Sequence, residues 1–92
     1  MAKNNIKIKN NSENRHFVYI LKCSDDTFYT GYTVDIQRRI NEHNSGEGAK
    51  YTRGRTPVKL IYKESFSSRS DAQKREYEIK KLPRSKKEEL IS

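Results

Sequence analysis

Apolar and β-branched residues form two short runs near the start of the chain, with a polar turn between them. The runs are residues 17–23 (FVYILKC) and 27–32 (TFYTGY), and the turn is 24–26 (SDD). Runs that are rich in aromatic and β-branched residues and flank turn-forming residues predict the two strands of a β-hairpin. A later run, 58–66 (VKLIYKESF), predicts a third strand.

The length of the hairpin loop decides which side chains share a face of the sheet. A three-residue loop pairs Tyr19 with Gly31, and the alternation of side chains along a strand then places Leu21 and Tyr29 on the same face. A two-residue loop places Tyr19 and Tyr29 on opposite faces. A joint function of the two tyrosines therefore requires the three-residue loop.

Helix signals follow the hairpin and the third strand. A first helix is predicted from Thr33 or Asp35 to about residues 44–46, where Gly46 suits the left-handed conformation that often ends a helix. Residues 44–57 are rich in glycine and basic residues and are predicted to form a loop. Residues 70–73 (SDAQ) fit a capping box for a second helix, which extends to about residue 82.

Pro83 is acceptable as the first residue of a short final helix, 83–91. The expected order of elements is therefore β-β-α-β-α-α. This order predicts a single small α/β (α+β) domain, residues 16–92, in which helices pack on a three-stranded, mostly antiparallel sheet. Residues 1–15 are rich in Asn and Lys and are predicted to be a disordered polar tail.

Composition and charge narrow the class of protein. The 92 residues are too few for two independent cores, and 20 Lys and Arg against 12 Asp and Glu give a net charge of +8. This excess predicts a polyanionic partner, either nucleic acid or an anionic membrane surface. No apolar run approaches the ~18 residues of a membrane helix, and the N-terminus has no apolar signal-peptide segment. One cysteine and two histidines exclude a disulfide framework and a structural zinc site, and we expect a cytoplasmic protein.

Helical geometry separates two adjacent arginines of the first helix. With Ile36 facing the sheet, a rotation of about 100° per residue places Arg39 and His43 at the margin of the apolar stripe, whereas Arg38 points into solvent. A guanidinium at the margin of a core must find an anion, because it cannot lose its proton. Arg39 is therefore either one half of a structural salt bridge, with Glu76 as a candidate partner, or a phosphate ligand.

Glu76 lies on the apolar side of the second predicted helix, in one stripe with Ala72 and Ile79. A carboxylate that faces a core is paired, protonated or metal-bound, because isolated burial costs several kcal/mol. One carboxylate, together with water and substrate oxygens, is a common way to hold Mg²⁺. The pattern leaves both a structural ion pair and a metal site open.

The tyrosines gain interest from the shared face with Gly31, whose missing side chain would let a substrate backbone approach. An unperturbed tyrosine has a pKa of about 10, and a neighbouring arginine or metal ion would lower that pKa by favouring the phenolate. His43 is a second candidate base near pH 7, and a hydrogen-bonded histidine at a helix end is the alternative.

Residues 50–59 carry four basic residues without an acid. Glycine exposes backbone N–H groups, arginine pairs with phosphate oxygens and tyrosine can stack on a base. This segment is therefore predicted to contact nucleic acid, with Arg38 and Tyr32 as further candidates. Its candidate contacts are Lys50, Tyr51, Arg53, Arg55 and Lys59.

Taken together, the motifs VYI (18–20) and YTG (29–31), the helix arginine and the helix glutamate resemble the GIY-YIG nuclease superfamily. The resemblance covers residues 16–91 and is closest to the small bacterial, YhbQ-like members, through residues 44–62 and the REYEIKKL segment. The first motif lacks its glycine. Tyr32 follows the second motif at a position where DNA-repair relatives often carry Lys.

The resemblance implies a role for each candidate catalytic residue. Tyr19 and Tyr29 would position or deprotonate the attacking water, with help from His43. Arg39 would offset charge on the transferring phosphoryl group, and Glu76 would bind one divalent ion, Mg²⁺ or Mn²⁺.

The leading hypothesis from the sequence is a metal-dependent endonuclease that acts on DNA, branched or damaged DNA included, with low sequence selectivity. A protein partner would then supply specificity. The alternatives are a non-catalytic nucleic-acid-binding module with the same fold, and an accessory protein that docks its basic face on an acidic partner. An assay for Mg²⁺- or Mn²⁺-dependent nicking distinguishes the first from the others.

Overall fold

A computed structural model describes residues 14–92, so the predicted tail lies outside the described residues except for its last two positions. The centre of the molecule is a sheet of three strands, β2 (His16–Lys22), β3 (Phe28–Thr33) and β4 (Lys59–Phe66). The strand order is β3-β2-β4 and both pairings are antiparallel. The first predicted strand therefore becomes the central one, which explains why its residues Val18–Leu21 are buried on both faces.

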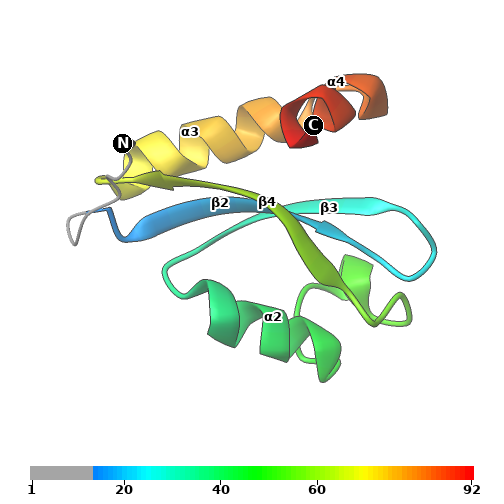
Figure 1. The fold of residues 1–92 in the computed structure, drawn as a ribbon. Coiled ribbons are helices and arrows are strands. Elements are labelled where there is room, and N and C mark those ends of the chain that lie inside the picture. Colours follow the sequence, from blue (N-terminus) through cyan, green and yellow to red (C-terminus); the bar gives the residue numbers. More distant parts are fainter. Residues whose placement is uncertain (1–13) are drawn as a thin grey trace.

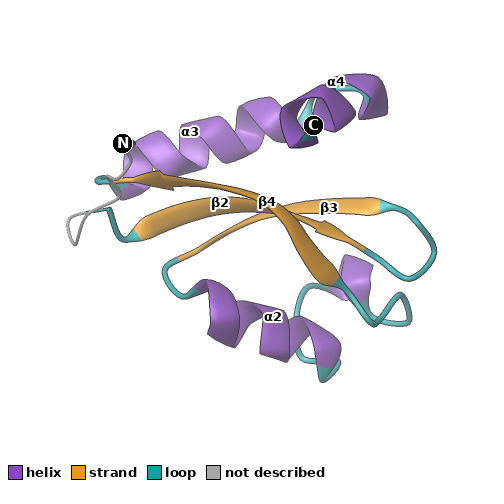
Figure 2. Ribbon diagram, in the orientation of Figure 1, coloured by secondary structure: helices purple, strands orange, loops and turns teal. Residues whose placement is uncertain are grey.

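Helices cover both faces of the sheet (Figure 1). On one side lie α3 (Arg69–Lys80) and α4 (Arg84–Ile91), and on the other lies α2 (Ile36–Asn44). Figure 2 shows a short helical turn between α2 and β4, which is the 3₁₀ helix η1 (Lys50–Thr52). The predicted fold class and the order β-β-α-β-α-α are confirmed for the described residues. None of the helices there is long and apolar enough to cross a membrane.

The hairpin adopts the three-residue loop. Tyr19 pairs with Gly31 and Leu21 with Tyr29, and the Cys23 amide donates to the carbonyl of Thr27 at 2.8 Å. Asp26 takes a positive φ of 71° at the end of this loop, a conformation that aspartate tolerates better than most residues. The predicted register is therefore confirmed, and the two motif tyrosines share a face.

The alternation of side chains along β2 produces two separate apolar clusters. Val18 and Ile20 point toward α3, where they pack with Ala72 and Ile79. Tyr19 points to the other side, into a cluster that also contains Leu21, Cys23 and Val58 and is flanked by Tyr29, Ile36, Ile40 and Leu60. The first cluster packs the sheet against α3. The second cluster includes the buried side chain of Tyr19, which carries a hydroxyl group.

The second predicted helix begins two residues earlier than the capping box at Ser70 suggested. Ser68 is the N-cap: its backbone is extended and its hydroxyl accepts from the Asp71 amide at 3.1 Å. Strand β4 ends at Phe66, so the chain must turn at once and Ser70 falls inside the first turn. Pro83 is likewise the N-cap of α4 and not its first helical residue. Gly46, after α2, takes the predicted positive φ, 88°.

Candidate active site

Tyr19 is the centre of the candidate site, and its side chain is almost fully buried, with 1% exposed. The ring of Tyr29 lies beside it, with 6.4 Å between the ring centroids. The imidazole of His43, on α2, approaches both phenol rings, at 6.1 Å from Tyr19 and 5.3 Å from Tyr29. The hairpin and α2 thus bring three of the predicted catalytic residues into one cluster.

Gly31 makes room for this cluster. A Cβ atom at Gly31 would lie 2.6 Å from Cζ of Tyr19 and 3.0 Å from the Tyr29 ring, and still closer to the Tyr19 hydroxyl. The space that a side chain would fill is therefore taken by Tyr19 itself. We expected the missing side chain to admit a substrate backbone, and the structure corrects that reason: the glycine is needed because the tyrosine hydroxyl sits against it.

A chain of hydrogen bonds fixes the protons around His43. The Thr52 hydroxyl donates to the carbonyl of Ala49 at 2.9 Å, so its oxygen is left to accept from Nδ1–H of His43 at 2.8 Å. With the proton on Nδ1, Nε2 is an acceptor, and the hydroxyl of Tyr19 donates to it at 3.0 Å. The geometry thus selects one tautomer of a neutral, fully buried histidine.

Burial sets the pKa of both partners in this bond. It raises the pKa of Tyr19 to about 12, and the guanidinium of Arg39, which acts in the opposite direction, does not offset it. The neighbouring arginine does act to lower the tyrosine pKa, as expected, but the effect of burial is larger. Burial also lowers the pKa of His43, and Arg39 adds to this effect. At neutral pH the resting pair is a phenol and a neutral imidazole.

Arg39 and Arg38 differ in the way that helical geometry predicted. The side chain of Arg39 is 32% exposed and that of Arg38 is 72% exposed. Both pair with Glu42, Arg39 at 2.8 Å and Arg38 at 3.2 Å. The carboxylate that pairs with Arg39 is therefore Glu42 and not Glu76. The guanidinium of Arg39 also lies near the Tyr19 hydroxyl and acts to lower the pKa of Tyr19.

Glu76 lies on α3, on the opposite side of the sheet from α2, and acts on Tyr19 through its charge. Its side chain is 21% exposed, its charge raises the pKa of Tyr19, and one of its oxygens lies 3.2 Å from Nζ of Lys80. Among the described residues, no group of three or more His, Cys, Asp or Glu side chains could hold a metal ion. A single carboxylate with one oxygen outside this ion pair fits Mg²⁺, which takes most of its ligands from water and substrate phosphate.

The glycine-rich loop packs over the site through Tyr51. The Tyr51 ring stacks on Tyr29 at a centroid distance of 5.9 Å, and the guanidinium of Arg55 lies 4.3 Å from the Tyr51 ring. Arg55 also lies 3.1 Å from Asp25, an ionic contact without the alignment of a good hydrogen bond. Tyr51 thus packs against Tyr29 at the candidate site, and Arg55 packs against Tyr51.

Three other basic candidates of this segment, Lys50, Arg53 and Lys59, are exposed. Tyr32, in contrast, belongs to the opposite face of the sheet, where its hydroxyl lies 2.8 Å from Nδ1 of His16 and its ring packs against the α3 cluster. Tyr32 therefore lies apart from the other candidates. Successive side chains of a strand point to opposite faces, so Tyr32 faces away from the side that Tyr29 and Gly31 share.

Thr52 and Gly48 are the residues that sequence reasoning missed. Thr52 is fully buried and orients His43. A Cβ at Gly48 would lie 2.7 Å from Cα of His43, so this glycine lets the loop pack directly on the histidine. Both lie in a loop without periodicity, and no local signal in the sequence connects either of them to a residue on α2.

For the endonuclease that the sequence predicts, Thr52→Val should lower the single-turnover rate of DNA cleavage by about 10- to 100-fold and leave DNA affinity unchanged. The valine cannot accept from Nδ1–H, so the tautomer that receives the Tyr19 proton is no longer selected. The histidine tautomer is measurable from its ¹⁵N chemical shifts. Thr52→Ser keeps the hydroxyl and should restore both the tautomer and the rate. A slow Thr52→Ser variant with the wild-type tautomer would contradict a positioning role for this hydroxyl.

Comparison with known proteins shows the family of this chain. The family model described as "GIY-YIG catalytic domain" matches residues 15–89. A UPF0213 protein of Halobacterium salinarum is 64% identical over 76 residues, which are 83% of this chain and 99% of that protein. A UPF0213 protein of Staphylococcus saprophyticus is 56% identical over 78 residues, which are 85% of this chain and 95% of that protein.

Two solution NMR structures have a similar fold. A UPF0213 protein of Bacillus halodurans is 55% identical with a TM-score of 0.55, over 83% of this chain and 81% of that chain. A protein of E. faecalis is 51% identical with a TM-score of 0.57, over 80% of this chain and 79% of that chain. With the family model matched over nearly the whole described domain, the chain belongs to the GIY-YIG family, and its relatives there are the UPF0213 proteins of bacteria and archaea.

Proposed function

We propose that this protein is a metal-dependent endonuclease that hydrolyses phosphodiester bonds of DNA with low sequence selectivity. The observation that carries the proposal is the hydrogen bond from Tyr19 to Nε2 of a neutral His43, with Arg39 and Glu76 close enough to shift the Tyr19 pKa. A proton acceptor, a cation and a carboxylate around one phenol are the groups that phosphodiester hydrolysis needs.

The resting proton positions suggest how water would be activated. Tyr19 has a pKa of about 12 and does not hold a phenolate at neutral pH, so it can accept a proton from water only as it gives up its own. Its hydroxyl proton moves to Nε2 of His43 at 3.0 Å as the oxygen receives a proton from the attacking water. The imidazolium that results keeps its Nδ1–H on Thr52.

Charge on the phosphoryl group is offset by Arg39, whose half-buried guanidinium lies beside the Tyr19 hydroxyl. Glu76 is the carboxylate that would hold one Mg²⁺ or Mn²⁺ ion. Such an ion, when bound, polarises the phosphoryl oxygens and stabilises the leaving oxygen. Tyr29, between His43 and Tyr51, completes the wall and would position the water.

Phosphate contacts from the exposed basic residues should dominate DNA binding. Lys50, Arg53 and Lys59 lie on the loop and strand beside the site, and Arg38 lies on the exposed face of α2. With about three to six phosphate contacts, log K should fall with log salt at about −0.9 per contact. Anisotropy titrations at several salt concentrations measure this slope. A slope near zero would exclude the basic loop as a phosphate-binding surface.

A second candidate function is a nucleic-acid-binding module that does not cleave. The observation that favours it is that both charged catalytic candidates already have partners, Arg39 with Glu42 and Glu76 with Lys80. If these ion pairs persist on DNA, neither group reaches the phosphate or a metal ion. The fold and the basic surface would then serve binding alone.

A nicking assay separates the two functions. Supercoiled plasmid and branched DNA are incubated with Mg²⁺ or Mn²⁺ and, in parallel, with EDTA. Endonuclease activity predicts metal-dependent conversion to the open circular form and cleavage near branch points. Stable binding without conversion under any metal condition would reject the enzyme and support the binding module. We further propose a cytoplasmic location and a protein partner that selects the DNA site.

A further inference from the structure

The two flanks of helix α3 differ in charge and in what they face. On the flank toward β4, Arg75 forms a two-atom contact with Glu64 at 2.9 and 3.0 Å and also pairs with Glu78 at 3.2 Å. Asp71 lies on the same flank by helical geometry. This side therefore carries three carboxylates and one guanidinium, and Arg75 is not available to a ligand.

The flank toward β3 carries Arg69, Gln73, Tyr77 and Lys80, together with Glu76 of the active site. Positions separated by three or four residues lie on one face of a helix, so these side chains form a single stripe. The Arg69 guanidinium lies 5.8 Å from the Tyr32 ring of β3. No carboxylate pairs with it in the ion pairs found among residues 14–92.

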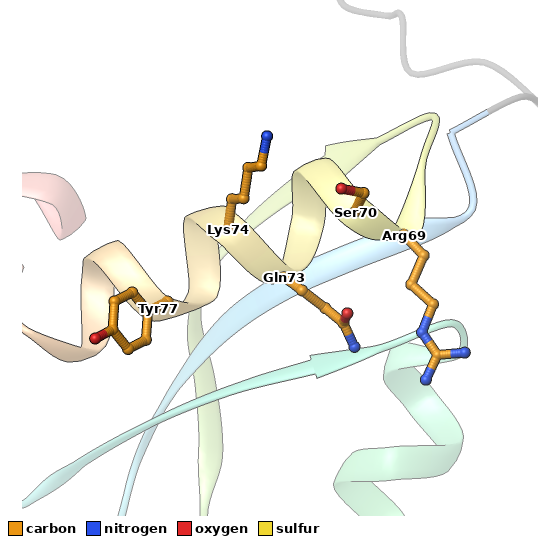
Figure 3. Close-up of a pocket in the computed structure, with 5 residues that line it drawn as sticks. All are labelled: Arg69, Ser70, Gln73, Lys74 and Tyr77. Atoms are coloured by element: carbon orange, nitrogen blue, oxygen red, sulfur yellow. The ribbon is translucent and has the colours of Figure 1, made fainter.

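A shallow groove on α3 is lined by Arg69, Gln73 and Tyr77, together with Ser70 and Lys74 (Figure 3). In this view Arg69 and Gln73 extend from α3 toward the edge strand and the start of α2, whereas Lys74 and Ser70 point away from that edge. β3 is an edge strand of the sheet. Arg69 and Gln73 therefore lie on the side of α3 that faces an open edge of the sheet, in the same helix stripe as Glu76.

Tyr77 is the most exposed large apolar side chain of the described residues, with 64% of its surface accessible. Its ring is held by Lys81, whose Nζ lies 4.5 Å from the ring centroid. An exposed aromatic ring beside a cation is the arrangement on which unpaired bases stack. Bases inside a duplex do not offer their faces, so such a ring favours a strand with an unpaired base.

The basic stripe continues past the active site. A second pocket, of about 230 Å³, is lined by Tyr29 and Tyr51 from the catalytic wall and by Lys80 and Lys87 from the two C-terminal helices. A strand that lies along α3 can therefore keep cationic neighbours on both sides of Glu76.

We propose that the β3-facing flank of α3 binds one DNA strand next to the scissile phosphate, with an unpaired base stacked on Tyr77 and phosphates on Arg69 and Lys80. This proposal rests on the proposed function and specifies its substrate as DNA with a single-stranded region at the cut. At 1.5 Å per residue, Arg69 and Lys80 are separated by about 16 Å along the helix, the rise of about five nucleotides in one strand.

The test is anisotropy binding in EDTA with a short fluorescein-labelled single strand and with the matching duplex. The wild-type protein should prefer the single strand. Tyr77→Ala should weaken single-strand binding by about 5- to 100-fold, the usual effect of losing one base stack, and change duplex binding little. Tyr77→Phe should keep the preference.

Arg69→Ala should weaken binding of both DNAs, because a phosphate contact is independent of base pairing. The matched control is Lys86→Ala, which removes one charge from an exposed α4 residue that pairs with Glu89. Its effect on both DNAs should be smaller than that of Arg69→Ala.

Unchanged single-strand binding by Tyr77→Ala, in a protein that binds and cuts DNA, would overturn this inference and leave the proposed function intact. If the wild-type protein binds neither DNA, both proposals fail. Equal losses of single-strand and duplex binding in Tyr77→Ala would also overturn the stacking role, because a disturbed helix surface and not a base contact would explain them.

Discussion

Glu76→Gln should abolish metal-dependent DNA cleavage while the fold survives. Glutamine keeps the shape of the side chain but removes the negative charge that would hold the divalent ion, and loss of metal-ion stabilisation of the transition state corresponds to about 10³-fold or more in rate. Only the partly exposed Lys80 loses an ionic partner, so the melting temperature without metal should change little. Plasmid nicking with Mg²⁺ and thermal unfolding with and without Mg²⁺ measure the two effects.

Glu78→Gln is the matched control, because Glu78 lies on the same helix, is 63% exposed and pairs with Arg75 on the other flank. It should cleave at the wild-type rate. A large loss of stability in Glu76→Gln, without any difference in the response to metal, would instead identify the Glu76–Lys80 pair as a structural element.

Arg39→Ala should lower the cleavage rate by ~10²–10³, similar to the loss of one preorganised donor to a charged transition state. DNA affinity should fall only modestly, because this interaction strengthens as charge develops on the phosphoryl group. Arg39 is half-buried beside Tyr19, where the proposed mechanism places the reacting phosphate. Single-turnover rates and binding constants, measured on the same DNA, separate the two effects.

Arg38→Ala is an unusually close control: it removes the same charge from the adjacent residue, which pairs with the same carboxylate, Glu42. Because Arg38 is 72% exposed, we expect a small loss of affinity and a nearly unchanged single-turnover rate. Equal effects of the two substitutions would show that α2 supplies only diffuse positive charge. If the wild-type protein and both arginine variants bind DNA and none of them cuts it, the result supports the non-catalytic binding module.

Local patterns in the sequence were sufficient for the fold and for much of the site. The sequence allowed two loop lengths, and the requirement that Tyr19 and Tyr29 act together selected the three-residue loop that the structure has. The 100° rotation per residue distinguished Arg39 from Arg38. These predictions succeeded because each depends on the geometry of one element, which a short stretch of sequence specifies. The face occupied by Tyr32 follows from the same alternation and was available from the sequence.

The tertiary structure alone decided the state and the partners of the candidate catalytic groups. The tautomer of His43 depends on Thr52, which lies on a separate loop nine residues further along the chain. The pKa of Tyr19 depends on burial between a strand and a helix, and burial outweighs the nearby arginine. Gly31 is required because the Tyr19 hydroxyl occupies the space of its side chain. Proton positions, desolvation and close packing arise from groups that meet only when the chain folds, so no periodicity in the sequence records them.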